Sequence, residues 1–433
     1  MLDDFIFGTA TSAYQIEGAW NQDGKVPSLW DEISHGNKVW TVQNKHTGDI
    51  ACNHYNEYEY DVEIMKQLGI QAYRFSISWS RICTQDCVCS NLKGIEFYRK
   101  LVAKLKEAGI EPFVTLYHWD LPKWLDDIGG WSNPKSIDYF KCYAETMFNA
   151  LPDVKHWITF NEPAVFVSNF WGHRNKQEAT RNVLLAHGKT VQLFRKNNDG
   201  KIGISLNLMP IYPYHIDNEL DKQFAKNIDD NHNRIWLDPI FKGKIPSSLK
   251  TDILTFSKKE QKIVSTPIDF IGVNYYTGIT IRHNESKKLG YEQVSGHYAT
   301  DNMGVEIRPT GLYDLLTILK EEYNNPEMYI TENGCALPDV LGHDVRVHDE
   351  KRIKYIREHL KACIVSIDDD INLKGYFYWS FMDNFEWLYG YNKKFGLLSM
   401  FWPNQSRVCK DSFFWYKNII TDKNFRNKEL GGN

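Results

Sequence analysis

Two motifs far apart in the sequence each carry a glutamate beside an asparagine. They are Asn161-Glu162-Pro163 and Glu332-Asn333-Gly334. When a fold brings two carboxyl groups to opposite sides of a bond, one can protonate the leaving oxygen while the other attacks the carbon or activates water. Two carboxyl groups placed in this way are the usual catalytic residues of glycoside hydrolysis. The two glutamates are therefore the first candidates for catalysis.

Other side chains that suit the binding of a sugar follow short apolar segments. Amides, carboxylates and an imidazole can hydrogen-bond hydroxyl groups, while indole faces cover the apolar C–H face of a sugar ring. Such groups stand at residues 15–17, 118–120, 274–276, 379 and 386–387. Together with the two glutamates they predict a carbohydrate site, provided that the fold gathers them in one place.

The apolar segments alternate with amphipathic ones, which is the pattern of parallel βαβ units. We predict strands at residues 5–11, 72–79, 112–119, 157–161, 201–206, 270–276, 328–331 and 375–381. We predict helices at residues 58–69, 94–108, 134–151, 178–196, 311–323 and 350–367. Eight such strands close most simply into a (β/α)₈ TIM barrel, an α/β fold whose active site lies at the C-terminal ends of the strands. That end of the barrel would hold all the candidate residues.

Length and composition fit one large barrel. The chain has 433 residues, 42% of them hydrophobic and 24% charged, which is ordinary for a globular protein. We expect a single barrel domain over residues 1–422 and a polar tail, residues 423–433, that frays. A net charge of −4 argues against a nucleic-acid partner. The sequence contains no apolar run typical of a signal peptide or a membrane helix, so we expect a cytoplasmic protein with no membrane partner.

The motifs resemble those of glycoside hydrolase family 1, the β-glucosidase family. The resemblance runs from about Phe5 to about Ile420 and rests on residues 13–18, 159–163, 329–334, 379–387 and 394–396. It implies a retaining exo-β-glycosidase that removes a terminal β-D-glucosyl residue, with galactosyl or fucosyl as alternatives, through a covalent glycosyl-enzyme. The substrate would be a small-molecule β-glycoside. The chemistry needs no cofactor and no metal, and it places the two carboxyl groups roughly 5–5.5 Å apart.

The resemblance also implies a role for each candidate residue. Glu162 would be the general acid/base and Glu332 the nucleophile, with Arg74 and Tyr276 holding Glu332 ionised. The hydroxyl groups of the sugar would be bound by Gln15, His118, Asn161, Glu386 and Trp387. Trp379 would form the floor beneath the sugar, and Phe395 would lie beside its distal hydroxyls.

Two alternatives stay open at this point. A non-catalytic sugar-binding relative of the same fold is disfavoured by the intact pair of glutamates, since such relatives tend to lose one of them. A related branch that cleaves 6-phospho-β-glycosides replaces the Glu-Trp pair with small residues, whereas this chain keeps Glu386-Trp387 and has Phe395 where that branch has a tyrosine. A carboxylate near a phosphate would also repel it.

Two loops depart from the pattern of the family. The segment after Glu162 is short, which puts the preference for the leaving group in doubt and predicts a more open cleft. The loop Cys83-Thr-Gln-Asp-Cys87-Val-Cys89 lacks the fourth ligand that a zinc site requires. Of the remaining readings, a disulfide or free thiols, we expect free thiols.

Overall fold

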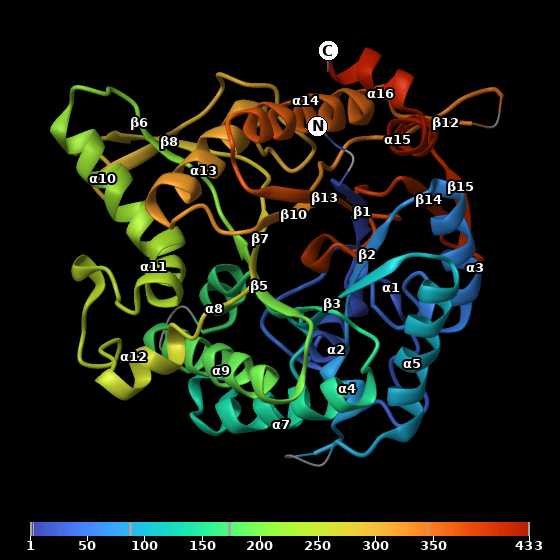
Figure 1. Cartoon of the computed structure of the whole chain (residues 1–433), viewed down its shortest axis with the longest axis horizontal. Coiled ribbons are helices and arrows are strands. Elements are labelled where there is room, and N and C mark those ends of the chain that lie inside the picture. Colours follow the sequence, from blue (N-terminus) through green and yellow to red (C-terminus); the bar gives the residue numbers. More distant parts are fainter. Residues whose placement is uncertain (1, 3, 86–88, 172–174, 345, 432–433) are drawn as a thin grey trace.

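The computed structural model describes residues 2, 4–85, 89–171, 175–344 and 346–431 (Figure 1). This part of the chain forms a closed barrel of parallel strands in the order β1-β13-β10-β7-β5-β4-β3-β2. The barrel strands are β1 (Ile6–Ala10), β2 (Ala72–Ser76), β3 (Glu111–Tyr117), β4 (His156–Asn161), β5 (Lys201–Asn207), β7 (Phe270–Asn274), β10 (Met328–Asn333) and β13 (Leu373–Trp379). Figure 1 shows these strands at the centre with helices around them.

The helices lie between and beside the barrel strands. They are α1 (Ala13–Ile16), α2 (Leu29–Ser34), α3 (His54–Leu68), α4 (Trp79–Ile82), α5 (Leu92–Glu107), α6 (Lys123–Asp126), α7 (Lys135–Ala150), α8 (Pro163–Trp171), α9 (Lys176–Asn197), α10 (Glu219–Asp229), α11 (Ile235–Lys242), α12 (Lys258–Val264), α13 (Pro309–Glu322), α14 (Glu350–Asp368), α15 (Asp411–Thr421) and α16 (Lys423–Leu430). A π-helical turn, η3 (Asp230–Arg234), joins α10 to α11. Within the described residues, no helix is both long and apolar enough to cross a membrane.

Short strands outside the barrel form three small sheets. One pairs β6 (Ile211–Pro213), β8 (Ile279–His283) and β9 (Tyr291–Val294), the second pairs β11 (Val340–Leu341) with β12 (Val347–His348), and the third pairs β14 (Leu398–Phe401) with β15 (Ser406–Cys409). They belong to the loops that extend the barrel. The fold predicted from the sequence, a (β/α)₈ barrel, is confirmed: each of the eight predicted strands contains or overlaps one barrel strand, and each of the six predicted helices overlaps one observed helix.

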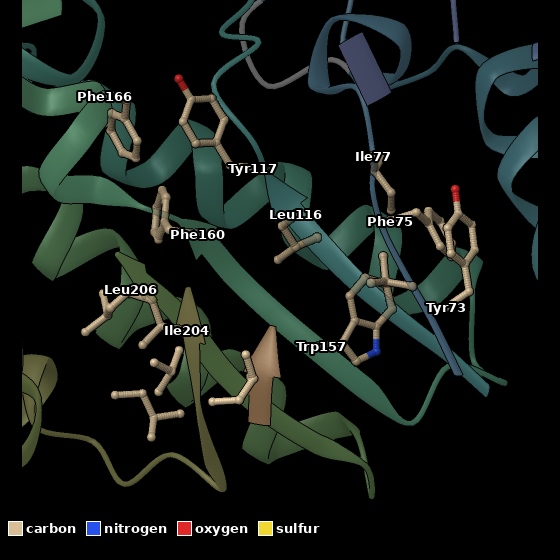
Figure 2. Close-up of a cluster of buried hydrophobic side chains, with 14 of the residues drawn as sticks. Tyr73, Phe75, Ile77, Leu116, Tyr117, Trp157, Phe160, Phe166, Ile204 and Leu206 are labelled. Carbon is tan, nitrogen blue, oxygen red and sulfur yellow. The ribbon is translucent and has the colours of Figure 1, made fainter. Parts of the chain in front are cut away.

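Apolar side chains pack both inside the barrel and between its strands and the surrounding helices. Inside, the rings of Phe113 and Phe377 lie 4.8 Å apart, and Tyr329 packs 5.3 Å from Phe113. Outside, large side chains point from the strands toward the surrounding helices, as Figure 2 shows for Trp157 and other residues of β2 to β5. The barrel is thus a packed core rather than a pore, which makes its strand ends a rigid base for a site.

The C-terminal tail corrects an expectation from the sequence. We expected residues 423–433 to fray, but Lys423–Leu430 form helix α16. The Asp422 side chain accepts hydrogen bonds from the backbone N–H groups of Asn424 and Phe425 and so caps the helix. Leu430 is buried, and the Arg426 guanidinium donates to the Ile419 carbonyl oxygen at 2.6 Å. A cap and a buried contact therefore order a segment whose composition is polar.

The cysteine loop after α4 corrects a second expectation. We expected free thiols, but Cys83 and Cys89 form a disulfide, with their Cα atoms 3.9 Å apart. Cys87, the third cysteine of the loop, lies outside the described residues.

Candidate active site

The C-terminal ends of the barrel strands surround a cavity of about 230 Å³. Most of the side chains predicted to form the site line it: His118, Glu162, Tyr276, Glu332, Trp379, Glu386, Trp387 and Phe395. The other three, Gln15, Arg74 and Asn161, are buried directly behind the lining and hydrogen-bond to it. The barrel therefore gathers residues that are scattered from position 15 to position 395 around one small space.

Glu332, in β10, is held by one cation and one hydroxyl. Arg74 Nη1 donates to Glu332 Oε1 at 2.6 Å, and the Tyr276 hydroxyl donates to Oε2 at 2.7 Å. Burial raises the pKa of Glu332, while Arg74 and the hydrogen bond from Tyr276 act in the opposite direction. Both carboxylate oxygens thus have a donor, and the negative charge has an adjacent positive partner.

Glu162 follows the last residue of β4 and has different surroundings. Its Oε1 accepts a hydrogen bond from Asn274 Nδ2 at 2.8 Å and a longer one from Asn207 Nδ2 at 3.3 Å. Burial, followed by the negative charge of Glu332, raises the pKa of Glu162 to about 8. Glu162 is therefore mostly protonated at neutral pH. Because both amides donate to Oε1, that oxygen acts as an acceptor and the proton is favoured on Oε2.

The two amides beside Glu162 are themselves held in one orientation. Thr331 Oγ1 donates to Asn274 Oδ1 at 2.7 Å, which leaves the Asn274 amide group to face Glu162. His232 Nε2 lies 3.1 Å from Asn207 Oδ1, and burial lowers the pKa of His232 to about 4. A neutral His232 that donates from Nε2 therefore turns the Asn207 amide group toward Glu162 in the same way.

A third carboxyl group, that of Glu386, lines the same cavity. Gln15 Nε2 donates to Glu386 Oε2 at 3.2 Å and to Asn384 Oδ1 at 2.9 Å. Burial, reinforced by the charges of Glu332 and Glu162, raises the pKa of Glu386 to about 8. A carboxyl group in this state can both donate to and accept from a hydroxyl group.

Asn161 connects several residues behind the cavity. Its Oδ1 accepts from Arg74 Nη2 at 2.5 Å and from Asn274 Nδ2 at 2.9 Å. Its Nδ2 donates to His118 Nε2 at 3.0 Å. Burial and the nearby Arg74 hold the pKa of His118 well below its usual range, so the imidazole is neutral. With Nε2 accepting, the ring hydrogen is on Nδ1, for which the described residues provide no partner.

Aromatic rings cover the floor and one wall of the cavity. His118 lies 5.7 Å from Trp379, and Trp387 stacks on Trp119 with ring centroids 4.7 Å apart. Glu162, Trp119 and Trp387 each have a positive φ, of 52°, 75° and 48°. This region of backbone space is unfavourable for residues other than glycine. The surrounding contacts therefore hold three residues of the site in conformations that they would not adopt alone.

The sequence did not identify several residues that line the cavity, among them Asn207 and Asp301. Asp301 Oδ1 accepts from the backbone N–H groups of Met303 and Val305, and its Oδ2 accepts from that of Ala336. These bonds fix the loop that forms one edge of the cavity. Asn207 is the polar residue at the end of β5, so the rule that strand ends carry the site could have found it. Asp301 belongs to a loop without a motif.

A buried ion-pair network supports the loop that carries Glu386. Lys410 Nζ lies 2.9 Å from Asp383 Oδ1 and 2.9 Å from Asp339 Oδ2, and all three side chains are almost fully buried. Asp383 Oδ1 also accepts from the Gly396 N–H at 2.8 Å. The network ties the segment before Glu386 to the segment that carries Phe395.

The cavity thus contains two carboxyl groups with opposite electrostatic surroundings. Glu332 is paired with a cation, and Glu162 is protonated and faces neutral amides. Such a pair can supply a nucleophile and an acid to one bond. Hydrogen-bonding groups and indole rings around them suit a sugar.

Comparisons with known proteins agree with this geometry. The model of glycosyl hydrolase family 1 matches residues 1–425. The chain is 44% identical to β-glucosidase A of Acetivibrio thermocellus, over 98% of each chain. A solved family 1 β-glucosidase from Thermotoga maritima has a TM-score of 0.92 at 40% identity, covering 96% of this chain and 97% of that one. The GH1 β-glucosidase from Exiguobacterium antarcticum B7 has a TM-score of 0.92 at 39% identity, over 96% of this chain and 97% of that one.

Proposed function

The chain belongs to glycosyl hydrolase family 1, and we propose that it is a retaining exo-β-glucosidase. It hydrolyses the bond between a terminal, non-reducing β-D-glucosyl residue and its leaving group. The observation that carries the proposal is the pair of carboxyl groups in one cavity, Glu332 beside Arg74 and Glu162 with a pKa of about 8. The curated relatives named as β-glucosidases support the choice of sugar.

The reaction proceeds in two displacements. Glu332 attacks the anomeric carbon while Glu162 gives its Oε2 proton to the leaving oxygen, and a covalent glycosyl-enzyme forms. Glu162, now ionised, takes a proton from a water molecule, which attacks the same carbon and releases the sugar with its configuration retained. Arg74 and Tyr276 hold the Glu332 carboxylate in place for the attack.

The remaining residues bind the sugar in the cavity. Glu386, Trp387 and His118 contact its hydroxyl groups, while Gln15 and Asn161 orient Glu386 and His118 from behind. Trp379 lies beneath the ring, and Phe395 lies beside the distal hydroxyls. The described lining of the cavity contains no lysine or arginine that could pair with a phosphate, so we propose a neutral sugar rather than a phosphorylated one.

Aryl glycosides with a p-nitrophenyl leaving group test the proposal. The β-glucoside should be hydrolysed, the β-galactoside and β-fucoside more slowly, and the α-glucoside and 6-phospho-β-glucoside not at all. Glu332→Gly should abolish turnover, and azide should restore it by taking the place of the missing carboxylate. Full activity of Glu332→Gly, or no hydrolysis of any β-glycoside by the folded protein, would refute the assignment. The second result would favour the non-catalytic binding protein.

The cytoplasmic location expected from the sequence stays a proposal. Among the described residues, Cys52, Cys335, Cys363 and Cys409 are free thiols, which suits a reducing compartment. The Cys83–Cys89 disulfide argues in the other direction. Thiol titration of protein isolated under trapping conditions would decide between the two.

A further inference from the structure

A second cavity, of about 480 Å³, adjoins the catalytic one. The two cavities share Trp119, Met303, Glu386 and Trp387 as lining residues. We call the second one the side cavity. Its own lining comes mainly from helix α2, the segment after it and the end of α8, and includes Trp30, Ile33, Trp40, Ser168, Asn169 and Phe170.

The shared lining residues place the side cavity at the sugar end of the catalytic cavity, although Ser168, Asn169 and Phe170 come from the segment after Glu162, which we had expected to shape the leaving-group side. It shares Glu386 and Trp387, which contact the sugar hydroxyls in the proposed mechanism. The leaving group must lie beside Glu162, where the catalytic cavity is lined by Val165 and Asn207. These three residues do not belong to the described lining of the side cavity.

Aromatic rings form a continuous path from the catalytic cavity along the side cavity. Trp119 stacks on Trp387 at 4.7 Å, and Trp387 lies 4.6 Å from Trp30. The path continues from Trp30 to Phe170 at 5.8 Å and from Phe170 to Trp40 at 5.5 Å. Such surfaces cover the apolar faces of sugar rings. Trp30 is itself almost fully buried, so the partly exposed Trp40 and Phe170 provide the ring surface that extends the sugar-binding region beyond the first sugar.

Size and polarity fit a second sugar. The catalytic cavity, at about 230 Å³, holds one hexosyl residue in the proposed function, and the side cavity has about twice that volume. Ser168 and Asn169 are exposed at its edge and can hydrogen-bond hydroxyl groups. An aromatic wall with a few polar groups is typical of a small-molecule site.

We propose that the side cavity is a second sugar subsite, on the non-reducing side of the bond that is cleaved. It accepts a glycosyl group attached to a hydroxyl of the sugar in the catalytic cavity. The enzyme then cleaves the bond between the inner sugar and its leaving group and releases an intact disaccharide. Water supplies the new anomeric hydroxyl of the disaccharide and the proton of the leaving group. This inference rests on the proposed function.

The test uses p-nitrophenyl β-glycosides of gentiobiose, laminaribiose and cellobiose, whose outer glucose is attached at different hydroxyls of the inner one. Attack at the inner bond yields p-nitrophenol and disaccharide together. Attack at the terminal bond yields glucose and p-nitrophenyl β-glucoside first. Chromatography of the early products separates the two courses. We expect intact disaccharide as the main early product from at least one of the three substrates.

Two variants test the place of binding. Ser168→Trp fills the side cavity from its exposed edge, and Trp40→Ala removes the outer end of the aromatic path. Neither residue lines the catalytic cavity. Each should lower kcat/KM for disaccharide release about tenfold, which corresponds to about 1.4 kcal/mol of lost binding energy, and change kcat/KM for p-nitrophenyl β-glucoside less than about twofold.

The outcomes separate the two proposals. Hydrolysis of p-nitrophenyl β-glucoside with only terminal attack on all three disaccharide substrates would refute the second subsite and leave the proposed function intact. Equal losses on both kinds of substrate in both variants would also refute it. No hydrolysis of p-nitrophenyl β-glucoside by the folded protein would refute the proposed function itself.

Discussion

Replacing Asn207 by alanine tests how the protein places the acidic proton. The variant removes one of the two amide donors to Glu162 Oε1 and leaves the 2.8 Å bond from Asn274. An amide donor stabilises the ionised form of Glu162. Without it the pKa of Glu162 rises above about 8. The basic limb of kcat/KM, where activity is lost as Glu162 loses its proton, should therefore move to higher pH.

The expected fall in kcat/KM follows from the length of the hydrogen bond between Asn207 and Glu162. A typical protein hydrogen bond contributes about 0.5–1.5 kcal/mol, which corresponds to roughly two- to twelvefold in rate. At 3.3 Å the bond from Asn207 is long, so we expect kcat/KM to fall about two- to fivefold at the pH optimum. The loss arises because a proton on Oε1 becomes less unfavourable when one of its donors is gone.

Two substrates with different leaving groups show whether the fall in kcat/KM comes from impaired proton donation by Glu162. The rate on an alkyl β-glucoside depends on proton transfer and should fall. The rate on 2,4-dinitrophenyl β-glucoside, whose leaving group departs without a proton, should not. Asn182→Ala is the matched control, because Asn182 is a buried amide that donates to the Trp131 carbonyl oxygen, away from the cavity. Equal losses on both substrates, or a basic limb that moves to lower pH, would refute the reasoning.

Three other substitutions test the supporting contacts. Arg74→Met leaves Glu332 without its cation, which we expect to cost about 3–5 kcal/mol and hence to lower kcat/KM at least a hundredfold. The pKa of Glu332 should rise as well, so the acidic limb of the pH profile of kcat/KM should move to higher pH. Lys410→Met leaves the buried Asp383 carboxyl group without its cation, while Asp339 keeps Arg352 and Lys394. Thermal unfolding should therefore begin at a lower temperature and KM should rise more than kcat falls, whereas an unchanged melting temperature would contradict the network. Cys83→Ser should lower the free energy of unfolding by about 2 kcal/mol, the loop-closure value for so short a loop, with kcat/KM unchanged at 25 °C because neither Cys83 nor Cys89 lines the cavity.

The barrel was predictable because its strands and helices follow simple periodic patterns. The strand ends were less so: the predicted strand at 72–79 stops at Ser76, and helix α4 begins at Trp79. A buried apolar run does not reveal where the backbone leaves the sheet. The disulfide could not be predicted either, because three cysteines in one loop allow several pairings and no pairing at all. The expectation that residues 423–433 fray rested on their polar composition and missed the Asp422 cap of α16, although an aspartate is a common helix start.

The site was predictable where a motif carries it and hidden where only the fold does. Glu162 and Glu332 stand in motifs, and the structure brings them to one cavity. His232 stands in none. It reaches Asn207 from the π-helical turn η3, in a stretch between β5 and β7 where we predicted no helix. Turns of this kind often occur at functional sites, yet no periodicity in the sequence marks them.

In the proposed mechanism Glu162 serves as an acid and then as a base, and the charges of the cavity suit this change of role. Four carboxyl groups line the cavity, those of Glu162, Asp301, Glu332 and Glu386, and Arg74 is the cation that contacts Glu332. While Glu332 is ionised, its charge helps to keep the proton on Glu162. In the proposed mechanism Glu332 then forms an ester with the sugar, so its charge is gone and Arg74 acts on Glu162 without it. Since Arg74 lowers the pKa of Glu162, the acid loses its proton readily at the stage when the reaction requires a base.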